Sequence, residues 1–469
     1  MRPAAGRRLS PADALWLDLD RPDNLMVIVA VVLLRERPDW DAVLDVVRER
    51  MVERHPVFGQ VPRASARRWG RPSWHDDPAF DLERHVHRTT LPGQGTDAAL
   101  QSYIEQHLHV PLDRGRPLWE VHLVDGHGGG AALVFRLHHA LADGIALTRV
   151  LLALTDALPE GAVATPRRDG RTEAPATPET PESPEAPGTP EAPEVPEAPD
   201  APETRRPRPG PVRTALTRVA RLVPAVGQLV LTTNPPSDVG GAPGQRKRVL
   251  WTAPLPLAGL KQAGRLVDAT LNDVLLSSVA GALHAYQVEH DASPVDLVTM
   301  VPVNLRPLDR PLPRELGNRF ALLFLRLPSS VGTTRQRLVE TKRRMDWLKG
   351  SPEVALTATL ISVIGRTTGR LERGVVDFFA DKAVGVTTNV AGPREQRQLA
   401  GVDVDGVLGW VPGSGRHTLG FCIFTYAESV RIGIMADEGV ISHPEALLAA
   451  FERELSATVA LAGATSMRS

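Results

Sequence analysis

The sequence predicts an α/β protein whose mixed β-sheets are flanked by helices. Apolar runs rich in β-branched residues alternate with segments whose apolar side chains recur at helical spacing. Short glycine-containing turns separate some of the strands, which is typical of hairpins within mixed sheets. The 469 residues suffice for two or three domains, and the hydrophobic (42%) and charged (23%) fractions are those of a globular protein.

Charge and cysteine content exclude several classes of protein. The net charge is −1, so no overall field favours nucleic acid or an anionic membrane. Cys422 is the single cysteine, which excludes an intrachain disulfide framework and fits a reducing compartment. No secretory signal is expected, and the longest apolar run, Leu25–Leu34, is far shorter than the roughly 20 residues of a membrane-spanning helix. We therefore expect a cytoplasmic protein whose contact with a membrane is at most peripheral.

Helices and strands alternate through the first part of the chain. Ser10 and Pro11 suit the N-cap and the first position of a helix that runs to Leu17. An apolar strand follows at Met26–Leu34, and Asp39 is expected to cap the next helix. The remaining expectations are a helix at 40–55, a hairpin within 67–77, an extended segment at 80–87 and helices at 96–109 and 144–158.

A β-hairpin is predicted between these last two helices. A strand at 120–124 and a turn at 126–130 precede the apolar strand Ala131–Leu137, which ends in His138 and His139. A strand end can hold titratable side chains in a fixed place at the edge of a sheet. Neighbouring side chains of an extended segment point to opposite faces, so the two histidines cannot both face one substrate.

Residues 160–211 differ in composition from the rest of the chain. From Pro175 to Pro202 a proline occurs at every third position, often followed by glutamate. Three residues per turn is the period of polyproline II, and such a composition forms no packed core. One interpretation is a docking strip for a proline-binding module. We favour a disordered linker, because a period alone is a weak signal.

The segment Val212–Leu231 is basic at its start and apolar in its second half. A helix lying on a membrane surface and a helix packed on the body of the protein explain this pattern equally well. Pro224 is expected to break or kink it. A loop rich in glycine and proline follows at 234–244.

The last part of the chain again alternates strands and helices. Thr270 or Asn272 is expected to cap a long helix. Strands are predicted at 248–251, 295–303, 318–327, 383–389, 419–426 and 429–436, and the other helices at 256–264, 333–348, 352–371 and 443–461. The chain thus divides into an N-terminal half (1–159), the linker (160–211), a helix-and-loop crossover (212–244) and a C-terminal half (245–469).

The residues after the central hairpin suggest acid–base chemistry without a metal. A histidine with a pKa near 6.5 is suited to take a proton from a hydroxyl or thiol. Adjacent histidines make a poor ligand pair for one metal ion, and no HExxH or CxxC motif accompanies them. No G-x-S-x-G motif supplies a serine nucleophile, so direct acyl transfer to an acceptor is favoured. By itself, however, the pattern also fits structural histidines.

The motif His138 to Gly144, HHALADG, resembles the HHxxxDG motif of the chloramphenicol-acetyltransferase-like, CoA-dependent acyltransferases. Within that superfamily the chain resembles the bacterial wax ester synthase/diacylglycerol acyltransferase family. Further matches occur in the same order along nearly the whole chain. They are LSPADALWL near the start, Pro117-Leu118-Trp119 (PLW), Asn272-Asp273 (ND), VPVNLRP followed by LGNRF, and NVAGP, where the family usually has NVPGP.

The resemblance implies two chloramphenicol-acetyltransferase-like domains with an active-site tunnel at their interface. It implies a diacylglycerol O-acyltransferase or a long-chain-alcohol O-fatty-acyltransferase, which makes triacylglycerol or wax ester without an acyl-enzyme. Acyl-CoA is then a substrate, and neither a further cofactor, a metal nor nucleic acid is expected. Because the acceptors are lipids, peripheral contact with the inner face of the plasma membrane or with lipid droplets is also expected.

The resemblance also assigns roles to the motif residues. His139 is the expected general base, and His138 and Asp143 are expected to hold it in place, Asp143 through an arginine. Gly144 is expected to have a structural role in the motif. Asn272 either stabilises the oxyanion or simply caps its helix, and the two remain open. Asp273 belongs to the same motif. Pro117, Leu118 and Trp119 are expected to pack beneath the hairpin.

Two other interpretations remain open. A condensation-type acyltransferase that uses carrier-bound thioesters shares HHxxxDG, but it should lack the PLW, ND and LGNRF motifs. A non-catalytic lipid-binding or membrane-adaptor protein could also use an acyltransferase scaffold, although the intact HHxxxDG motif argues against it.

Overall fold

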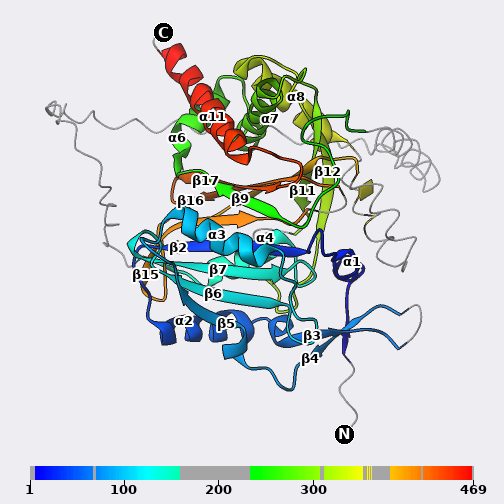
Figure 1. Ribbon diagram of the computed structural model, residues 1–469, viewed down its shortest axis with the longest axis vertical. Coiled ribbons are helices and arrows are strands. Elements are labelled where there is room, and N and C mark those ends of the chain that lie inside the picture. The colour runs from blue at the N-terminus through cyan, green and yellow to red at the C-terminus, as the bar shows by residue number, and fades with distance from the viewer. Residues whose placement is uncertain are drawn as a thin grey trace, which may run out of the picture. The chain divides into compact units, whose positions relative to one another are not determined.

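The computed structural model describes residues 6–66, 70–158, 233–306, 311–351, 356, 357, 359, 361, 381–413 and 416–466. The predicted linker (160–211) and the segment 212–231 lie outside these residues, as does nearly all of the helix expected at 352–371. The described residues form two large mixed sheets flanked by helices (Figure 1). The predicted α/β class with mixed sheets is therefore confirmed.

The first large sheet, here called the N-terminal sheet, contains the predicted hairpin at its centre. Strands β5 and β6 run parallel, and every other neighbouring pair is antiparallel. Strand β2 is buried along its whole length, as its continuous apolar sequence predicts. In spatial order the described strands are β5 (Val86–Thr90), β6 (Trp119–Asp125), β7 (Ala131–His138), β2 (Val27–Leu34), β15 (Val402–Trp410), β14 (Arg397–Leu399) and β8 (Asp156–Ala157).

The second large sheet, here called the C-terminal sheet, has parallel pairs only on the two sides of β13. Strand β9 (Lys247–Trp251) pairs with β17 beside the main path of the sheet. A separate small sheet joins β1 (Arg7–Arg8), β4 (Ser73–Asp76) and β3 (Gln60–Arg63). The described path of the C-terminal sheet is β10 (Leu255–Pro256), β17 (Ser429–Asp437), β16 (Leu419–Tyr426), β13 (Gly385–Ala391), β11 (Leu297–Asn304) and β12 (Phe320–Leu327).

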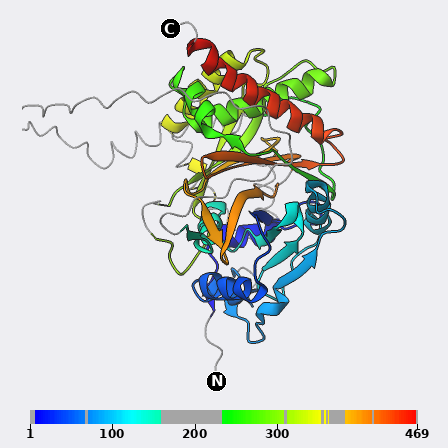
Figure 2. The ribbon, with the colours of Figure 1, turned by 90° about the vertical axis from the view of Figure 1, so that its left-hand side faces the viewer.

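Helices cover the outer faces of these sheets. The helices α6, α7, α8 and α11 share one hydrophobic core with the C-terminal sheet, whereas α2 and α4 pack against the N-terminal sheet. Both views show the first group on the side of the C-terminal sheet away from the N-terminal sheet (Figures 1 and 2). Their bounds are α1 Pro11–Leu19, α2 Trp40–Val47, α3 Asp97–Leu108, α4 Gly144–Ala153, α6 Leu257–Arg265, α7 Leu271–Glu289, α8 Thr334–Gly350 and α11 Pro444–Ser466.

Side-chain caps begin most of these helices where the sequence predicts. Ser10 and Asp13 form a capping box at α1, and Thr270 and Asp273 form another at α7. Thr270 is therefore the N-cap of α7, and Asn272 lies inside the helix at its second position. Asp39, Thr96, Asp143 and Thr333 cap α2, α3, α4 and α8.

Some boundaries in the N-terminal half differ from the prediction. The hairpin expected within 67–77 pairs β3 with β4, so its first strand lies earlier in the chain. The segment expected to be extended at 80–87 contains a 3-10 helix, Leu82–Arg84, before β5 begins. Helix α2 is followed by a π-helical stretch, Arg48–Val52. The helix expected at 144–158 ends at Ala153, because the chain then turns to form β8 at the sheet edge.

The two large sheets are not made of consecutive halves of the chain. Strands β14 and β15 come from the C-terminal part of the sequence, yet they extend the N-terminal sheet beside β2. Strand β15 was absent from the sequence prediction. Its segment, VDVDGVLGW, mixes acidic residues with glycines and so lacks the apolar run of a buried strand. The predicted boundaries at 159, 211 and 244 stay predictions.

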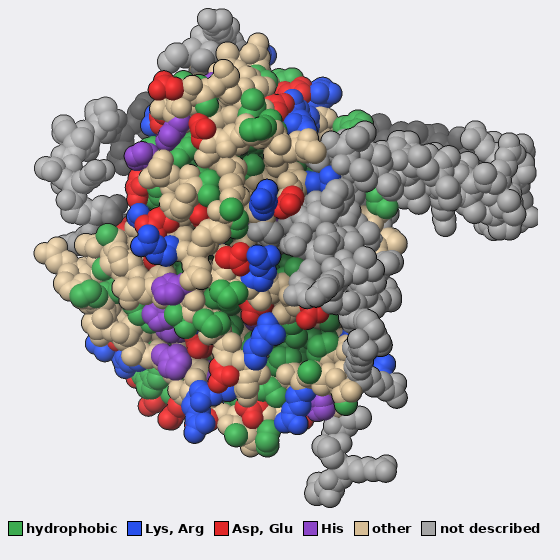
Figure 3. All heavy atoms as spheres, turned by 45° about the vertical axis from the view of Figure 1, so that its right-hand side comes forward, with side chains coloured by type: hydrophobic (Ala, Val, Ile, Leu, Met, Phe, Trp, Pro, Cys, Tyr) green, Lys and Arg blue, Asp and Glu red, His purple; other side chains and the backbone are tan. Residues whose placement is uncertain are grey.

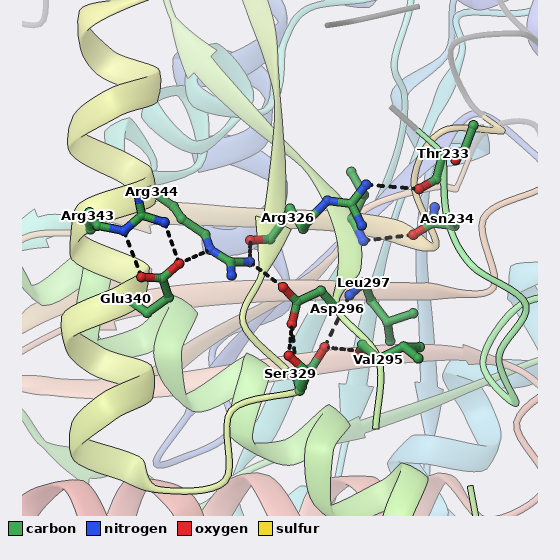
Figure 4. A network of polar contacts seen from close by, with 12 residues as sticks. Thr233, Asn234, Val295, Asp296, Leu297, Arg326, Ser329, Glu340, Arg343 and Arg344 are labelled. Carbon is green, nitrogen blue, oxygen red and sulfur yellow. Dashed lines mark hydrogen bonds and ion pairs between the residues drawn. The ribbon is translucent and has the colours of Figure 1, made fainter. Parts of the chain in front are cut away.

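A polar network fixes Thr233 and Asn234 to the C-terminal sheet and its surroundings (Figure 4). The side-chain amide of Asn234 donates to the Lys382 carbonyl and accepts from the Val298 backbone N–H, both at 2.8 Å. Arg326 of β12 donates to the Thr233 carbonyl at 3.1 Å. Thr233 and Asn234 are therefore attached to β12 and β11 by hydrogen bonds.

The same network continues to helix α8 (Figure 4). Arg344 donates to the Asp296 carboxylate, to Glu340 and to the Arg326 carbonyl. Hydrogen bonds from Arg343 and Arg344 lower the pKa of Glu340 to about 2, against the opposite effect of burial.

Within the described residues, no helix combines the length and apolar composition that crossing a membrane requires.

Candidate active site

His139 lies where β7 ends and the chain turns toward α4. Its backbone N–H donates to the Met26 carbonyl of the neighbouring strand at 2.7 Å, which extends the sheet contact by one residue. Its ring stacks on Trp16 of α1, with ring centroids 4.0 Å apart and planes 23° apart. Sheet and helix therefore fix the position of the imidazole between them.

The polar partner of the His139 ring is Asn318, which precedes β12. The ring Nδ1 lies 3.2 Å from Asn318 Oδ1, and Asn318 Nδ2 donates to the His139 carbonyl at 2.9 Å. Burial lowers the pKa of His139 to about 4, although a hydrogen bond with its own backbone, the charge of Asp143 and the hydrogen bond with Asn318 act in the opposite direction. At neutral pH the ring is thus uncharged and can accept a proton.

His138 faces the opposite way, as the alternation along a strand requires. Its side chain is buried, and its Nδ1 accepts a hydrogen bond from the Ala140 N–H at 3.0 Å. Its Nε2 lies 3.6 Å from the Asp20 carboxylate. Burial would raise the pKa of Asp20, but the His138 contact and other hydrogen bonds bring it below its usual value. His138 therefore stabilises the turn through its contacts with Ala140 and Asp20.

Asp143 connects the histidine turn to the C-terminal part of the chain. One carboxylate oxygen caps α4 by accepting from the Ala146 N–H at 2.8 Å. The other accepts from Arg306 Nε at 3.3 Å and from the Arg319 backbone N–H at 2.9 Å. Arg306 in turn donates to the Gly317 carbonyl. Asp143 thus holds the loop through an arginine and a backbone amide.

A cavity opens beside His139, between α1 and the start of α4 on one side and β11, β12 and β13 on the other. Its volume is about 1250 Å³, including its opening to solvent. Most of its lining is apolar, and its polar side chains are few. The lining residues are Leu15, Trp16, Leu19, His139, Asp143, Gly144, Ile145, Met300, Pro302, Val303, Asn304, Phe320, Leu322, Phe324, Thr357, Ile361, Val386, Thr388, Asn389, Val411 and Pro412.

The two residues of the ND motif, Asn272 and Asp273, do not line this cavity. The Oδ1 of Asn272 accepts from Nδ2 of Asn389, which does line it, at 3.2 Å. Asp273 completes the capping box of α7, and its other carboxylate oxygen lies 3.7 Å from Lys349 Nζ. Asn272 is not the N-cap of α7, because Thr270 has that role.

The PLW residues lead into the hairpin, and Trp119 is the first residue of β6, paired with Leu137 of β7. Trp119 is fully buried, stacks on His85 at 4.7 Å and donates its indole N–H to the Phe58 carbonyl at 2.7 Å. The Leu118 carbonyl accepts from the His138 backbone N–H at 3.0 Å. Pro117 is also buried. None of the three lines the cavity.

Gly144 lies at the edge of the cavity. It begins α4, and a Cβ atom built on it would meet no other atom within 4 Å. Neither a close approach nor a positive φ explains the glycine here. Because Gly144 lines the cavity, its missing side chain leaves room there.

Sequence reasoning missed three residues beside the cavity. Asn318 and Asn389 lie in the LGNRF and NVAGP motifs, which the sequence marked only as family matches. Trp16 lies in the predicted first helix, where its apolar character suggested nothing beyond packing. Their common signal was a place inside a family motif, but the contact of Asn318 with His139 spans 179 residues and has no local pattern.

On the face shown in Figure 3, acidic and basic side chains of the described residues are interspersed. Among the described residues, histidine, cysteine and carboxylate groups do not come together as a metal site. The buried Cys422 lies in β16, where burial raises the pKa of its thiol to about 12.

The family models identify the chain. Residues 9–275 match the wax ester synthase/diacylglycerol acyltransferase catalytic domain, and residues 316–458 match the C-terminal domain of that family. A relative from Mycobacterium tuberculosis named "Probable diacyglycerol O-acyltransferase tgs1" is 28% identical, with 97% of this chain and 96% of that protein aligned.

Two solved structures share the fold. The wax ester synthase/diacylglycerol acyltransferase from Marinobacter aquaeolei VT8 matches with a TM-score of 0.67 at 21% identity, covering 97% of this chain and 100% of that one. The first condensation domain of the CDA synthetase matches with a TM-score of 0.59 at 16% identity, covering 98% and 96%. The family models cover both halves of the sequence, and the chain therefore belongs to the wax ester synthase/diacylglycerol acyltransferase family of acyltransferases.

Proposed function

We propose that the protein transfers a fatty acyl group from acyl-CoA to the hydroxyl of a diacylglycerol, a long-chain alcohol or both. The observation that carries this proposal is the position of His139, which lines a mainly apolar cavity with its ring stacked on Trp16 and its pKa lowered by burial. An apolar cavity suits acyl and alkyl chains, and a neutral imidazole suits removal of a hydroxyl proton. The names of the family and of its relatives point to the same substrates.

The proposed reaction has one base and no acyl-enzyme. The bare ring nitrogen of His139 takes the proton from the acceptor hydroxyl as its oxygen attacks the thioester carbonyl. The tetrahedral intermediate that forms carries a negative oxygen. When the carbon–sulfur bond breaks, the CoA sulfur takes the proton from the His139 imidazolium, so the base is regenerated. The products are an ester and CoA, and acyl-CoA is the only activated group the reaction needs.

The negative oxygen of the intermediate requires a hydrogen-bond donor. The sequence suggested Asn272, but Asn389 is the asparagine of this pair that lines the cavity. We therefore assign the donor role to the side-chain amide of Asn389. Asn272 then holds Asn389 in place through the 3.2 Å hydrogen bond. With these roles, Asn272 of the ND motif acts on the reaction through Asn389 and does not contact the substrate.

The acceptors also bear on where the enzyme works. Diacylglycerols and long-chain alcohols reside in membranes or lipid droplets, so peripheral contact with such a surface follows from the proposed substrates. The segment 212–231 is the part of the sequence best suited to that contact, and it lies outside the described residues. We accordingly propose a cytoplasmic protein that reaches the inner face of the plasma membrane or lipid droplets.

The test is CoA release from palmitoyl-CoA, with dioleoylglycerol and hexadecanol compared side by side as acceptors. We expect acceptor-dependent release, and His139→Ala should lower kcat/KM by about 100-fold or more, the usual contribution of a general base. His75→Ala is a matched control, because His75 lies in β4 of the small sheet and does not line the cavity. Release with neither acceptor, or near-normal turnover by His139→Ala, would contradict the proposal.

A further inference from the structure

We infer that Asp13 and Asn318 form a positioning pair that holds His139 as the tautomer with its proton on Nδ1 and with Nε2 bare. The inference deepens the proposed function and rests on His139 being the general base. It assigns a role to two residues outside HHxxxDG, at opposite ends of the sequence.

The orientation of the Asn318 side chain is fixed by its hydrogen bonds. Its Nδ2 donates to Asp13 Oδ1 and to the His139 carbonyl oxygen, both at 2.9 Å. Neither oxygen carries a hydrogen to donate, so an amide turned the other way would place two acceptors face to face at each contact. Asn318 is 8% exposed, so water does not readily replace these partners.

The fixed amide is one of two groups beside the His139 ring that bear on which nitrogen carries the proton; the other is the backbone of His139 itself, which also hydrogen-bonds the ring. Asn318 Oδ1 lies 3.2 Å from His139 Nδ1 and, as an acceptor, it requires a hydrogen there. The ring is neutral at pH 7, so a proton on Nδ1 leaves Nε2 with a free lone pair. A general base needs that lone pair to accept the hydroxyl proton.

Asp13 is itself held by the start of helix α1. Its Oδ2 accepts from the Ser10 backbone N–H at 3.2 Å, while Oδ1 accepts from the backbone and side chain of Asn318 at 2.9 Å each. The loop approaches closely because residue 317 is a glycine. Its φ is +151°, and a Cβ atom there would lie 3.3 Å from the Asp13 carboxylate.

One helix therefore orients the base in two ways. Asp13 acts on the ring through Asn318, and Trp16, one turn later in α1, stacks on the ring face. Asn318 joins this arrangement from the segment before β12, so the base is complete only when α1, β7 and the C-terminal part of the chain are assembled.

The test reads the tautomer directly. Protein labelled with ¹⁵N-histidine is studied by two-bond ¹H–¹⁵N correlation at pH 7, with His139→Gln used to assign the His139 signals. We expect Nδ1 to be protonated in the wild-type protein. Asn318→Leu should move population to the Nε2-protonated form, and kcat should fall at least tenfold with KM changed less than about twofold, because a wrong tautomer affects the chemical step.

A second variant and a control separate positioning from folding. Asp13→Asn keeps the shape of the side chain but gives Asn318 a partner that can also donate, so it should shift the tautomer in the same direction. Asn234→Leu is the control: this asparagine also makes two hydrogen bonds through its amide, at the other end of β11. It should lower stability without changing the His139 tautomer or kcat. Should Asn318→Leu fail to fold, Asp13→Asn decides the question.

The outcomes distinguish the inference from the proposed function. A wild-type His139 protonated on Nε2, or an unchanged tautomer and kcat in Asn318→Leu and Asp13→Asn, would overturn the inference and leave His139 as base untouched. Full activity of His139→Gln would instead refute the proposed function, and the tautomer measurement would still report whether the pair orients the ring.

Discussion

At the scale of single residues, the proposed reaction depends on keeping one imidazole uncharged. Trp16 covers one face of the His139 ring, and the cavity beside it is mainly apolar. Such surroundings disfavour the imidazolium, and burial lowers the pKa of His139 to about 4. His139 is therefore in a proton-accepting form at neutral pH, as the proposed role of general base requires, at the cost of some intrinsic basicity.

The lowered pKa of His139 predicts a loss of stability in acid. An unfolded histidine has a pKa near 6.5, so between about pH 6.5 and pH 4 the unfolded chain binds a proton that the folded chain does not. The free energy of unfolding should therefore be highest above pH 6.5 and fall as the pH approaches 4, by up to about 3 kcal/mol for this group. His55, His85 and His122 act in the same direction, because burial lowers the pKa of each.

Urea unfolding at pH 7, 5.5 and 4.5 measures this dependence. His139→Gln removes one of the four contributions, so its unfolding free energy should fall less steeply over that interval. His75→Ala is the control and should keep the wild-type slope. An equal slope in His139→Gln and the wild type would show that the histidine is not protonated more readily in the unfolded chain.

Sequence reasoning could predict part of this residue-level arrangement. Alternation along a strand predicts that His138 and His139 face opposite ways, which the contacts of His138 with Ala140 and Asp20 match. It could not predict Asn318 as the partner of the ring, because the two residues meet only through the packing of the sheets. The same is true of Asn389, which lines the cavity and donates a hydrogen bond to Asn272. The sequence pointed to Asn272 and not to Asn389.

At the scale of elements, strand β15 connects the two large sheets. It pairs with β2 in the N-terminal sheet and packs on β16 and β17 of the other. Glycines make this close approach possible: a Cβ atom on Gly433 would lie 2.3 Å from the Gly409 carbonyl oxygen. Within β15 itself, a Cβ atom on Gly406 would lie 2.7 Å from Arg431 Nε, and one on Gly409 would lie 3.3 Å from Cys422 Sγ. The glycines that conceal β15 from sequence analysis thus also allow its packing.

Trp410, at the end of β15, should carry much of this contact. It is 1% exposed, lies against Trp251 with ring centroids 5.7 Å apart, and donates its indole N–H to the Leu250 carbonyl at 3.3 Å. Trp410→Ala should lower the free energy of unfolding by about 3–5 kcal/mol, as large-to-small changes in a core do. The measurement is chemical denaturation followed by circular dichroism.

Trp347 provides a matched control for that experiment. It lies in α8 with 52% of its surface exposed, so Trp347→Ala should change the unfolding free energy by no more than about 0.5 kcal/mol. Equal losses for the two tryptophan variants would mean that β15 is not a structural link between the sheets.

At the scale of the whole molecule, the site exists only through residues far apart in sequence. The cavity takes side chains from α1 and the start of α4 on one side, and from β11, β12 and β13 on the other. A hydrogen bond between Asp143, which precedes α4, and Arg306, which follows β11, connects the two sides. The order of motifs along the sequence therefore predicts the family and the class of fold, but the meeting of the motifs depends on how the two sheets pack.

At the same scale, we predict that the proline-rich segment is dispensable for folding. On one side of residues 159–232, β8 pairs with β14, and Asp156 contacts Arg50 at 2.8 Å. On the other side, Asn234 is fixed by two hydrogen bonds. Deleting residues 175–202 leaves both attachments intact and still leaves 46 residues between Leu158 and Thr233. The composition of the deleted stretch cannot supply a packed core.

The deletion variant should therefore unfold at the wild-type temperature within about 2 °C and release CoA at the wild-type rate, since surface changes away from packed contacts have small effects. Replacing residues 175–202 by a Gly/Ser segment of equal length separates length from composition. If the deletion loses activity and the replacement keeps it, the segment acts as a spacer whose length matters. If both variants unfold earlier or lose activity, the proline period itself contributes to the working protein, and its interpretation as a linker is wrong.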